Sequence, residues 1–420
     1  MSTEGTIAET GAASPPSSED IAALDAVLGT TEYHSDPYAT LSRIREVAPV
    51  YRSKVLDAWL ISRFEDVATV LRNGTDFSAK SFGKMVKRTP ETREIIELIE
   101  NNMIGSLDPP DHTRLRRILQ NGVFTAERLV HLRATITEIV THVLDQLESR
   151  GHMDVMTDLT QPVAYGFLTR FLGVAPEEGQ KFLGWAGTIA QFMLQPNADD
   201  AAVKRGVQAF EEVRAYVEDQ IEQRVANPTT KDVFGLLVSV RQEEDLSDDE
   251  ILATAMQMVF AGAGTVSNGV ANTIYQLLRH PEQYAALCAN PKLINAAFEE
   301  GTRCESPVFF TYRITTTDVT LNGTTIPAGE TVIVNIGGAN RDPDMFDDPE
   351  RFEIMRKRAP HLGFGFGPHV CFGARIARLQ GEIILNELIH RFPNLQLDGE
   401  NVRWSENFAL REMKALPVSW

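Results

Sequence analysis

The stretch FGFGPHVCFGARIARLQ, residues Phe364–Gln380, sets Cys371 in a loop rich in glycine and phenylalanine, directly before a predicted helix. Glycines cost backbone entropy, so several together indicate unusual backbone angles or a close approach to something flat and bulky. The glycines are Gly363, Gly365, Gly367 and Gly373, and the phenylalanines Phe364, Phe366 and Phe372 add an apolar wall. Partial positive charge at a helix start favours a thiolate. Cys371 is therefore a buried apolar residue, a nucleophile or a ligand.

The surroundings of Cys371 weigh these three possibilities. A nucleophile needs a nearby base, but His369 is only two residues away, a spacing that points the two side chains apart in most conformations. A zinc site needs more Cys or His in close spacing, and Cys288 and Cys304 lie far off in the sequence. A haem iron needs one axial thiolate, a glycine-rich turn for the macrocycle and cations for its propionates.

Composition restricts the function classes. The chain has 420 residues and a net charge of −18, from 40 basic and 58 acidic residues, which argues against nucleic-acid binding. Three cysteines make no disulfide framework, which favours a reducing cytoplasm. Residues 1–20 lack a basic and an apolar region, so we expect a disordered tail rather than a signal peptide. No run of about 18 apolar residues predicts a membrane span.

Periodicity predicts a mainly helical chain with a small β sheet built from both ends of the sequence. Residues 21–420 are expected to form one domain. Residues 78–107 are expected to form a long, partly helical loop. One long helix is predicted from the capping box of Ser247 and Glu250 to Pro281. Asn322-Gly323 predicts a hairpin. Further helices are predicted at 41–47, 64–71, 125–150, 208–227, 291–306 and 374–391, and strands at 50–53, 58–63, 309–338 and 408–420.

Basic side chains for two propionates are spread over the chain. DPPDHTRLRR puts His112 and Arg116 at i, i+4 on one helical face, although this pair is equally consistent with a surface helix. Arg313 stands in a predicted strand after SPVFF, and His369 lies in the cysteine loop. Together they provide four candidates.

The motif Phe364-Gly-Phe-Gly-Pro-His369-Val-Cys371-Phe-Gly373 resembles the haem-binding signature of the cytochromes P450. Three more motifs follow the family order. AGAGT, residues 261–265, is similar to the oxygen-binding groove of its long I helix, Glu300-Gly-Thr-Arg303 to the Glu-x-x-Arg of its K helix, and ANRDPDMFDDPERF to its meander. The resemblance runs from about residue 33 to the C-terminus and is to the short bacterial type.

The resemblance implies the family fold, a triangular prism with haem b between the long I helix and the L helix, which follows the cysteine. It implies Cys371 as the proximal thiolate ligand of the iron. His112, Arg116, Arg313 and His369 would hold the propionates, and the haem would also be lined by Phe364, Gly365, Gly373 and Ala261. Glu300, Arg303 and Arg351 would form a buried structural ion-pair triad.

The sequence departs from the family pattern at one catalytic position. The usual order is Ala-Gly-x-acid-Thr, with the acid helping to deliver protons to the bound oxygen, but here Gly264 precedes Thr265. Three outcomes stay open. Water relays protons through Thr265, the substrate supplies a polar group, or the enzyme runs peroxide-driven or non-hydroxylating chemistry, such as isomerisation or coupling.

The resemblance also implies a monooxygenase that inserts one oxygen atom from O2 into a hydrophobic small molecule. The residues expected to contact this substrate are Phe82, Met85, Met103, Ile104, Phe192, Met193, Met258, Val259, Ala261, Val308, Phe309, Phe310, Phe408 and Leu410. The apolar, methionine-containing set suits a hydrophobic ligand, including an aromatic one.

No flavin or ferredoxin module is recognisable in the sequence, so a separate ferredoxin with its reductase is the expected electron donor to a monomeric enzyme. Four arginines would flank the proximal side and attract an acidic ferredoxin, unless they are ordinary solvated side chains. They are Arg114, Arg117, Arg375 and Arg378. A haem-based sensor is the non-enzymatic alternative.

Overall fold

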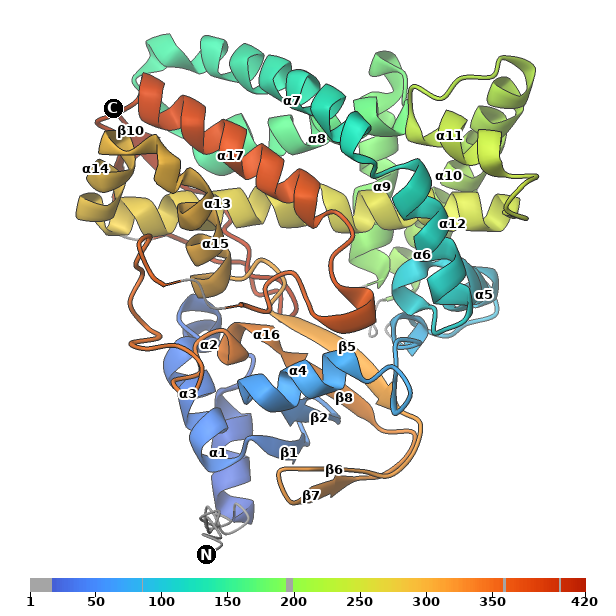
Figure 1. Ribbon diagram of the computed structural model, residues 1–420. Coiled ribbons are helices and arrows are strands. Elements are labelled where there is room, and N and C mark those ends of the chain that lie inside the picture. The colour runs from blue at the N-terminus through green and yellow to red at the C-terminus, as the bar shows by residue number, and fades with distance from the viewer. Residues whose placement is uncertain (1–16, 85, 194–198, 358–359, 400–401) are drawn as a thin grey trace, which may run out of the picture.

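The computed structural model describes residues 17–84, 86–193, 199–357, 360–399 and 402–420. Helices dominate, as predicted, and one small sheet lies beside the N-terminus, away from the main helical layer (Figure 1). Most of the predicted tail lies outside the described residues. Its last residues differ from the prediction, because a capping box at Ser17 starts a helix at Ser18.

The helices in chain order are α1 (Ser18–Val27), α2 (Thr31–Ser35), α3 (Tyr38–Val47), α4 (Phe64–Arg72), α5 (Arg93–Asn102), α6 (Asp111–Gly122), α7 (Ala126–Leu147), α8 (Gln161–Leu172), α9 (Gly179–Met193), α10 (Asp200–Ala226), α11 (Val233–Val240), α12 (Asp248–Gly262), α13 (Gly264–Arg279), α14 (Pro281–Ala289), α15 (Ile294–Cys304), α16 (Ile336–Ala339) and α17 (Ala374–Arg391). The predicted loop over 78–107 thus contains α5, whose buried face is Ile95, Ile96, Leu98 and Ile99.

The main sheet has the order β1-β2-β8-β5-β3 and joins strands from both ends of the chain, which confirms that prediction. Its strands are β1 (Val50–Ser53), β2 (Ala58–Ile61), β3 (Phe77–Ser78), β5 (Phe310–Thr315) and β8 (Thr331–Asn335). β2 pairs with β8 in parallel, with Trp59 opposite Val332, and the other pairs are antiparallel. The N-terminal strands are thereby tied to the strand that carries Arg313.

Two smaller sheets complete the described strands. β6 (Val319–Leu321) and β7 (Thr324–Ile326) form the predicted hairpin, with Asn322 and Gly323 at φ 47° and 76°. β4 (His152–Asp154), β10 (Pro417–Ser419) and β9 (Gln396–Leu397) form the other sheet. The closing strand is therefore shorter than the 408–420 region predicted, with only isolated bridges at Leu410 and Met413.

The predicted long helix is two helices. α12 ends at Gly262, α13 begins at Gly264, and the two continue along nearly one line through the molecule (Figure 1). Two glycines around Ala263 weaken the helical ladder, since each lowers helix stability by about 1 kcal/mol relative to alanine. The capping box at Ser247 and the stop at Pro281 are as predicted.

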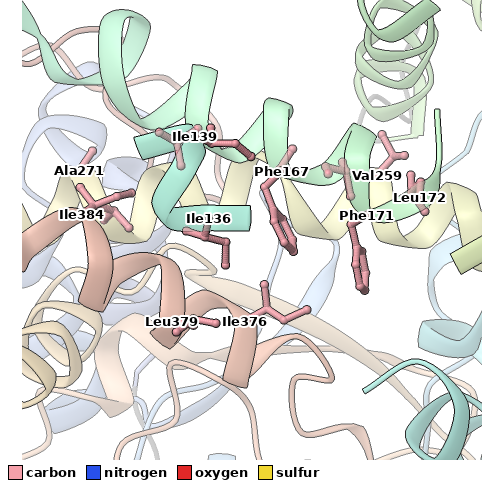
Figure 2. Packing of buried hydrophobic residues seen from close by; sticks show 14 of the residues in the cluster. Ile136, Ile139, Phe167, Phe171, Leu172, Val259, Ala271, Ile376, Leu379 and Ile384 are labelled. Carbon is pink, nitrogen blue, oxygen red and sulfur yellow. The ribbon is translucent and has the colours of Figure 1, made fainter. Parts of the chain in front are cut away.

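The core lies between this helical rod and the helices packed on it. Figure 2 shows isoleucine, leucine and phenylalanine side chains of α7, α8, α12 and α17 filling the space between these helices. Ile136, Leu172 and Ile384 are at most 1% exposed. Each such side chain contributes about 1.5–3 kcal/mol through burial. This packing fixes the start of α17, and therefore Cys371, relative to α12 and α13.

Candidate active site

Cys371 lies between a short 3-10 turn, Gly367–His369, and the start of α17. Its amide donates a hydrogen bond to the carbonyl of Phe364 at 2.7 Å, which closes the loop. Gly367 has φ 73°, and a Cβ there would lie 2.6 Å from the carbonyl oxygen of Leu71. A side chain would therefore push the loop away from α4. A Cβ on Gly373 would meet nothing within 4 Å, so the space beside Cys371 is open there.

The side chain of Cys371 is exposed by surface area, yet burial raises the pKa of its thiol. The two observations are consistent with a sulfur that faces an opening walled by protein atoms. The amides of Gly373 and Ala374 and the charges of Arg378 and Arg116 act in the opposite direction and lower the pKa. A cation at the sulfur would complete the stabilisation of a thiolate.

His112, Arg116 and His369 come together beside this loop. The imidazole rings of His112 and His369 lie 4.0 Å apart between centroids. Arg116 donates to the carbonyl of Val370 at 2.9 Å. Burial lowers the pKa of His112 to about 4 and that of His369 to about 3, and nearby arginines lower both further. Both histidines are therefore neutral at pH 7 in this structure, so only two of the four predicted groups carry charge.

Two buried groups at this cluster are incompletely paired. Arg313 is 7% exposed, and its one hydrogen bond among the described residues runs to the carbonyl of Tyr312 at 2.7 Å. Burial lowers the pKa of Arg313 to about 10, against the attraction of Asp108. His112 is 2% exposed, and its Nε2 has no hydrogen-bond partner in the part of the chain described. Burial of a poorly paired cation and of an unpaired ring nitrogen lowers the stability of the folded protein unless an anion binds them.

Ala261, Gly264 and Thr265 share an open face where α12 meets α13. Ala261 is exposed, and Gly264 and Thr265 are partly exposed, although the rod runs through the interior. A Cβ on Gly264 would meet nothing within 4 Å, so the place of the missing acid is empty of protein atoms. The hydroxyl of Thr265 donates to the carbonyl of Ala261. The threonine is thus held against the helix rather than directed at another side chain.

The predicted ion-pair triad needs one correction. Glu300 accepts two hydrogen bonds of 2.8 Å from Arg303, as predicted. The third member is Arg356, whose Nε lies 3.0 Å from the Glu300 carboxylate. Arg351 instead turns outward, with a 62% exposed side chain paired to Glu353, and only its backbone carbonyl meets Arg303. The third member of the triad is therefore Arg356, which follows the meander motif, rather than Arg351 at its end.

The predicted substrate contacts divide by burial. Phe82, Ile104, Met258, Val308, Phe408 and Leu410 keep partly exposed side chains, whereas Met103, Phe192, Val259, Phe309 and Phe310 are buried. Phe192 packs on Gly206 of α10, and Phe309 packs on Gly337 and Tyr38. The buried five belong to hydrophobic core clusters, and their contact with a substrate stays a prediction. Met85 and the side chain of Met193 lie outside the part of the chain that the structure describes.

Sequence reasoning missed Phe260, which is partly exposed on α12 and meets the ring of Phe82 at 6.0 Å. Gln257 of the same helix was also missed, and its side chain accepts a hydrogen bond from the amide of Gly105. The sequence signal that could have found both residues is their spacing. Gln257, Phe260, Ala261 and Gly264 stand at i, i+3, i+4 and i+7, so they share one face of a helix.

The proposed basic face is largely neutralised by carboxylates. Arg117 pairs with Glu244 at 2.6 Å, Arg378 with Glu299 at 2.7 Å, and Arg114 with Glu250. Arg375 is exposed, and no ion pair involves it in the described ranges. The face is therefore less positive than a count of its arginines predicts.

Within the described residues, no group of three or more His, Cys, Asp or Glu side chains is arranged to hold a metal ion. This finding disfavours the zinc alternative for Cys371, because a structural zinc site needs four protein ligands. No helix of the described chain is long and apolar enough to cross a bilayer.

Comparison with known proteins identifies the family. The family model for Cytochrome P450 matches residues 188–414. The chain is 32% identical to the biotin biosynthesis cytochrome P450 of Bacillus subtilis over 93% of this chain and 98% of that protein. It is 33% identical to the 6-deoxyerythronolide B hydroxylase of Saccharopolyspora erythraea, again over 93% of this chain and 98% of that protein.

Solved structures agree. P450BioI in complex with an acyl carrier protein ligated to hexadec-9Z-enoic acid superimposes with a TM-score of 0.86 at 31% identity, covering 93% of this chain and all of that one. The polyketide synthase cytochrome P450 PksS of Bacillus subtilis gives 0.83 at 29% identity, covering 93% of this chain and 98% of that one. The chain belongs to the cytochrome P450 family. It is a bacterial-type haem b monooxygenase.

The cysteine loop fits haem b on the observations above. It offers one thiolate donor, free space beside Gly373, a buried arginine bonded only to one backbone carbonyl, and a buried histidine nitrogen without a partner among the described residues. The arginine and the histidine match two carboxylates. A haem iron asks the protein for few ligands, so this donor set is sufficient.

Proposed function

We propose that Cys371 is the proximal ligand of the haem iron and that this enzyme inserts one oxygen atom into a hydrophobic substrate with electrons from a ferredoxin. The single observation that carries the proposal is the exposed thiol of Cys371, in a loop that packs beside the incompletely paired Arg313 and His112. When bound, haem b supplies the iron at which dioxygen is activated by two electrons and two protons.

Arg313, Arg116, His112 and His369 would hold the propionates. Arg313 and Arg116 carry the charge, and the two neutral imidazoles act as hydrogen-bond donors, so carboxylate binding raises the pKa of both rings. Phe364 and Phe372 keep water from the sulfur, and the guanidinium of Arg378 lies 4.4 Å from the ring of Phe364. Arg378 also stabilises negative charge on the thiolate.

Proton delivery would use water in the place of the missing acid. The empty position beside Gly264 is bordered by two polar groups, the carbonyl of Ala261 and the hydroxyl of Thr265, which supports a bound water there. Thr265 would pass protons from that water. Peroxide-driven or non-hydroxylating chemistry is the alternative, and the absence of a carboxyl group at position 264 is the observation that favours it.

The substrate would be an apolar molecule of the size of a fatty acyl chain or a macrolactone. The names of similar proteins support this class, because they include a biotin biosynthesis enzyme, an acyl carrier protein complex and a 6-deoxyerythronolide B hydroxylase. Phe82, Phe260 and Met258 offer partly exposed apolar surface for it. The enzyme would act as a cytoplasmic monomer, and Arg375 would contribute to ferredoxin binding.

A coupled turnover assay tests the proposal. The purified holoenzyme is supplied with a ferredoxin, its reductase, NADH and O2, and a panel of fatty acids and macrolactones is scored by spin-state shift and by product. Oxygenated product formed in proportion to NADH consumed supports the monooxygenase. Product formed only when hydrogen peroxide replaces NADH and the ferredoxin supports the alternative.

A further inference from the structure

One face of α12 differs from the rest of that helix. Residues 250 to 256 and Val259 are buried, whereas Gln257 and Phe260 are partly exposed and Ala261 is exposed. Gln257, Phe260, Ala261 and Gly264 follow the spacing i, i+3, i+4, i+7, so they share one side of the helical rod. Gln257 is therefore a polar side chain on the same open side as the oxygen-activating residues.

The amide of Gln257 is held in a fixed orientation. Its Oε1 accepts a hydrogen bond from the backbone N–H of Gly105 at 3.3 Å. A Cβ on Gly105 would lie 2.8 Å from that oxygen, so glycine permits the approach. Because a backbone N–H can only donate, the oxygen of the side chain must face Gly105. The NH2 group points elsewhere, and it has no hydrogen-bond partner among the residues that the structure describes.

The neighbours of Gln257 make a polar amide unusual there. Phe260 meets Phe82 at 6.0 Å, and Met258 and Ile104 are apolar and partly exposed. Gln257 is partly exposed, so water can hydrate its NH2 group in the ligand-free protein. A bound apolar ligand that displaces this water leaves the donors unpaired, at a free-energy cost, unless the ligand supplies an acceptor. A purely hydrocarbon substrate would leave this cost in place.

We propose that the Gln257 NH2 group donates a hydrogen bond to a carbonyl or hydroxyl oxygen of the substrate and so sets which carbon is oxidised. This inference rests on the proposed function and specifies its substrate class. Gln257 precedes Thr265 by eight residues, and at 1.5 Å rise per residue the two lie about 12 Å apart along the rod. The substrate therefore carries an oxygen acceptor remote from the carbon that reacts.

The test compares two probes of equal shape in the holoenzyme, dodecan-2-one and 2-methyldodec-1-ene, in which a methylene group replaces the carbonyl oxygen. Binding is measured by spin-state titration, and the position of oxidation by product analysis. The wild type binds the ketone about tenfold more tightly than the alkene and oxidises it far from the carbonyl, because one good hydrogen bond is worth about tenfold in affinity.

Two variants isolate the donor. Gln257→Glu keeps the acceptor for Gly105 but has no N–H, and Gln257→Leu removes both groups. Each is expected to reduce the ketone-to-alkene affinity ratio to about one and to scatter the oxidised positions. Gln208→Glu is the control, since Gln208 lies exposed on α10 and bonds to Glu212.

Three results overturn the inference: no ketone binding by the wild type, an equal preference in wild type and Gln257→Glu, or unchanged positions of oxidation. The CO spectrum of each reduced protein separates this failure from failure of the proposed function. If the wild type lacks a thiolate-type spectrum, the proposed function itself is wrong.

Discussion

Removal of Arg356 tests whether the meander is held by this residue rather than by Arg351. The Arg356 side chain donates to the Glu300 carboxylate at 3.0 Å and to the carbonyls of Arg351 at 2.7 Å and Asp348 at 3.1 Å. Burial raises the pKa of Glu300, but the hydrogen bonds from Arg303, Glu353 and Arg356 outweigh it and hold the pKa below its usual value. Each donor therefore helps to keep the buried carboxylate charged.

The expected loss follows from these contacts. Glu300 is 6% exposed, and in the Arg356→Ala variant it keeps both hydrogen bonds from Arg303. The buried carboxylate therefore loses one donor but stays paired. One charge-assisted bond and two or more bonds to carbonyls then disappear, and Arg356→Ala is expected to lower the free energy of unfolding by about 2–4 kcal/mol. Arg351→Ala removes an exposed ion pair and is expected to cost at most about 1 kcal/mol.

Urea unfolding of the two holoenzyme variants, followed by circular dichroism, measures this difference. The matched pair is informative because the two arginines lie five residues apart, Arg351 at the end of the meander motif and Arg356 just after it. Equal destabilisation by the two variants, or a larger effect from Arg351→Ala, would refute the reasoning that Arg356 completes the network.

Two further predictions concern the proton relay and the histidines. Thr265→Ala is expected to lower product per NADH on the order of tenfold and to release peroxide, while Gly264→Asp restores the acid and raises coupling. Unchanged coupling in both variants excludes a relay at this position. The pKa of His112 is about 4 in the folded protein, against an ordinary 6.5, so the unfolded chain binds the proton first as pH falls. Between pH 7 and 5.5 the haem-free protein is therefore expected to lose about 1–2 kcal/mol of unfolding free energy from this group, and the loss levels off below pH 4. Urea midpoints at the two pH values measure this loss, and the haem-loaded protein should show less of it. The same loss in His112→Gln would assign it to other groups.

Local motifs made the cysteine site predictable, because residues 364–373 determine their own loop geometry. The burial of Arg313 and the neutral state of His112 and His369 were not predictable, since both depend on packing between segments far apart in the sequence. Glu300 and Arg303 were found because they are one helical turn apart. Their partner was missed because the direction in which a meander arginine turns is set by tertiary contacts.

The helical regions were predictable where periodicity was strong, as in α7 and α17. The interruption at Ala263 was not predictable from periodicity, because the apolar pattern continues through Gly262 and Gly264. Only the structure shows that these two glycines end one helix and begin the next. Met103, Phe192 and Phe309 were assigned to the substrate from their apolar character, which core and pocket residues share. Burial in the folded chain is what separates the two groups.

The central claim is that Cys371 is the thiolate ligand, and the CO difference spectrum of the reduced haem protein tests it most directly. The wild type and Cys288→Ser should both give the thiolate-type Soret band, since Cys288 lies on α14, away from the cysteine loop. Cys371→Ser should lose it. A thiolate-type band that persists in Cys371→Ser, or is missing from the wild type, would contradict the account.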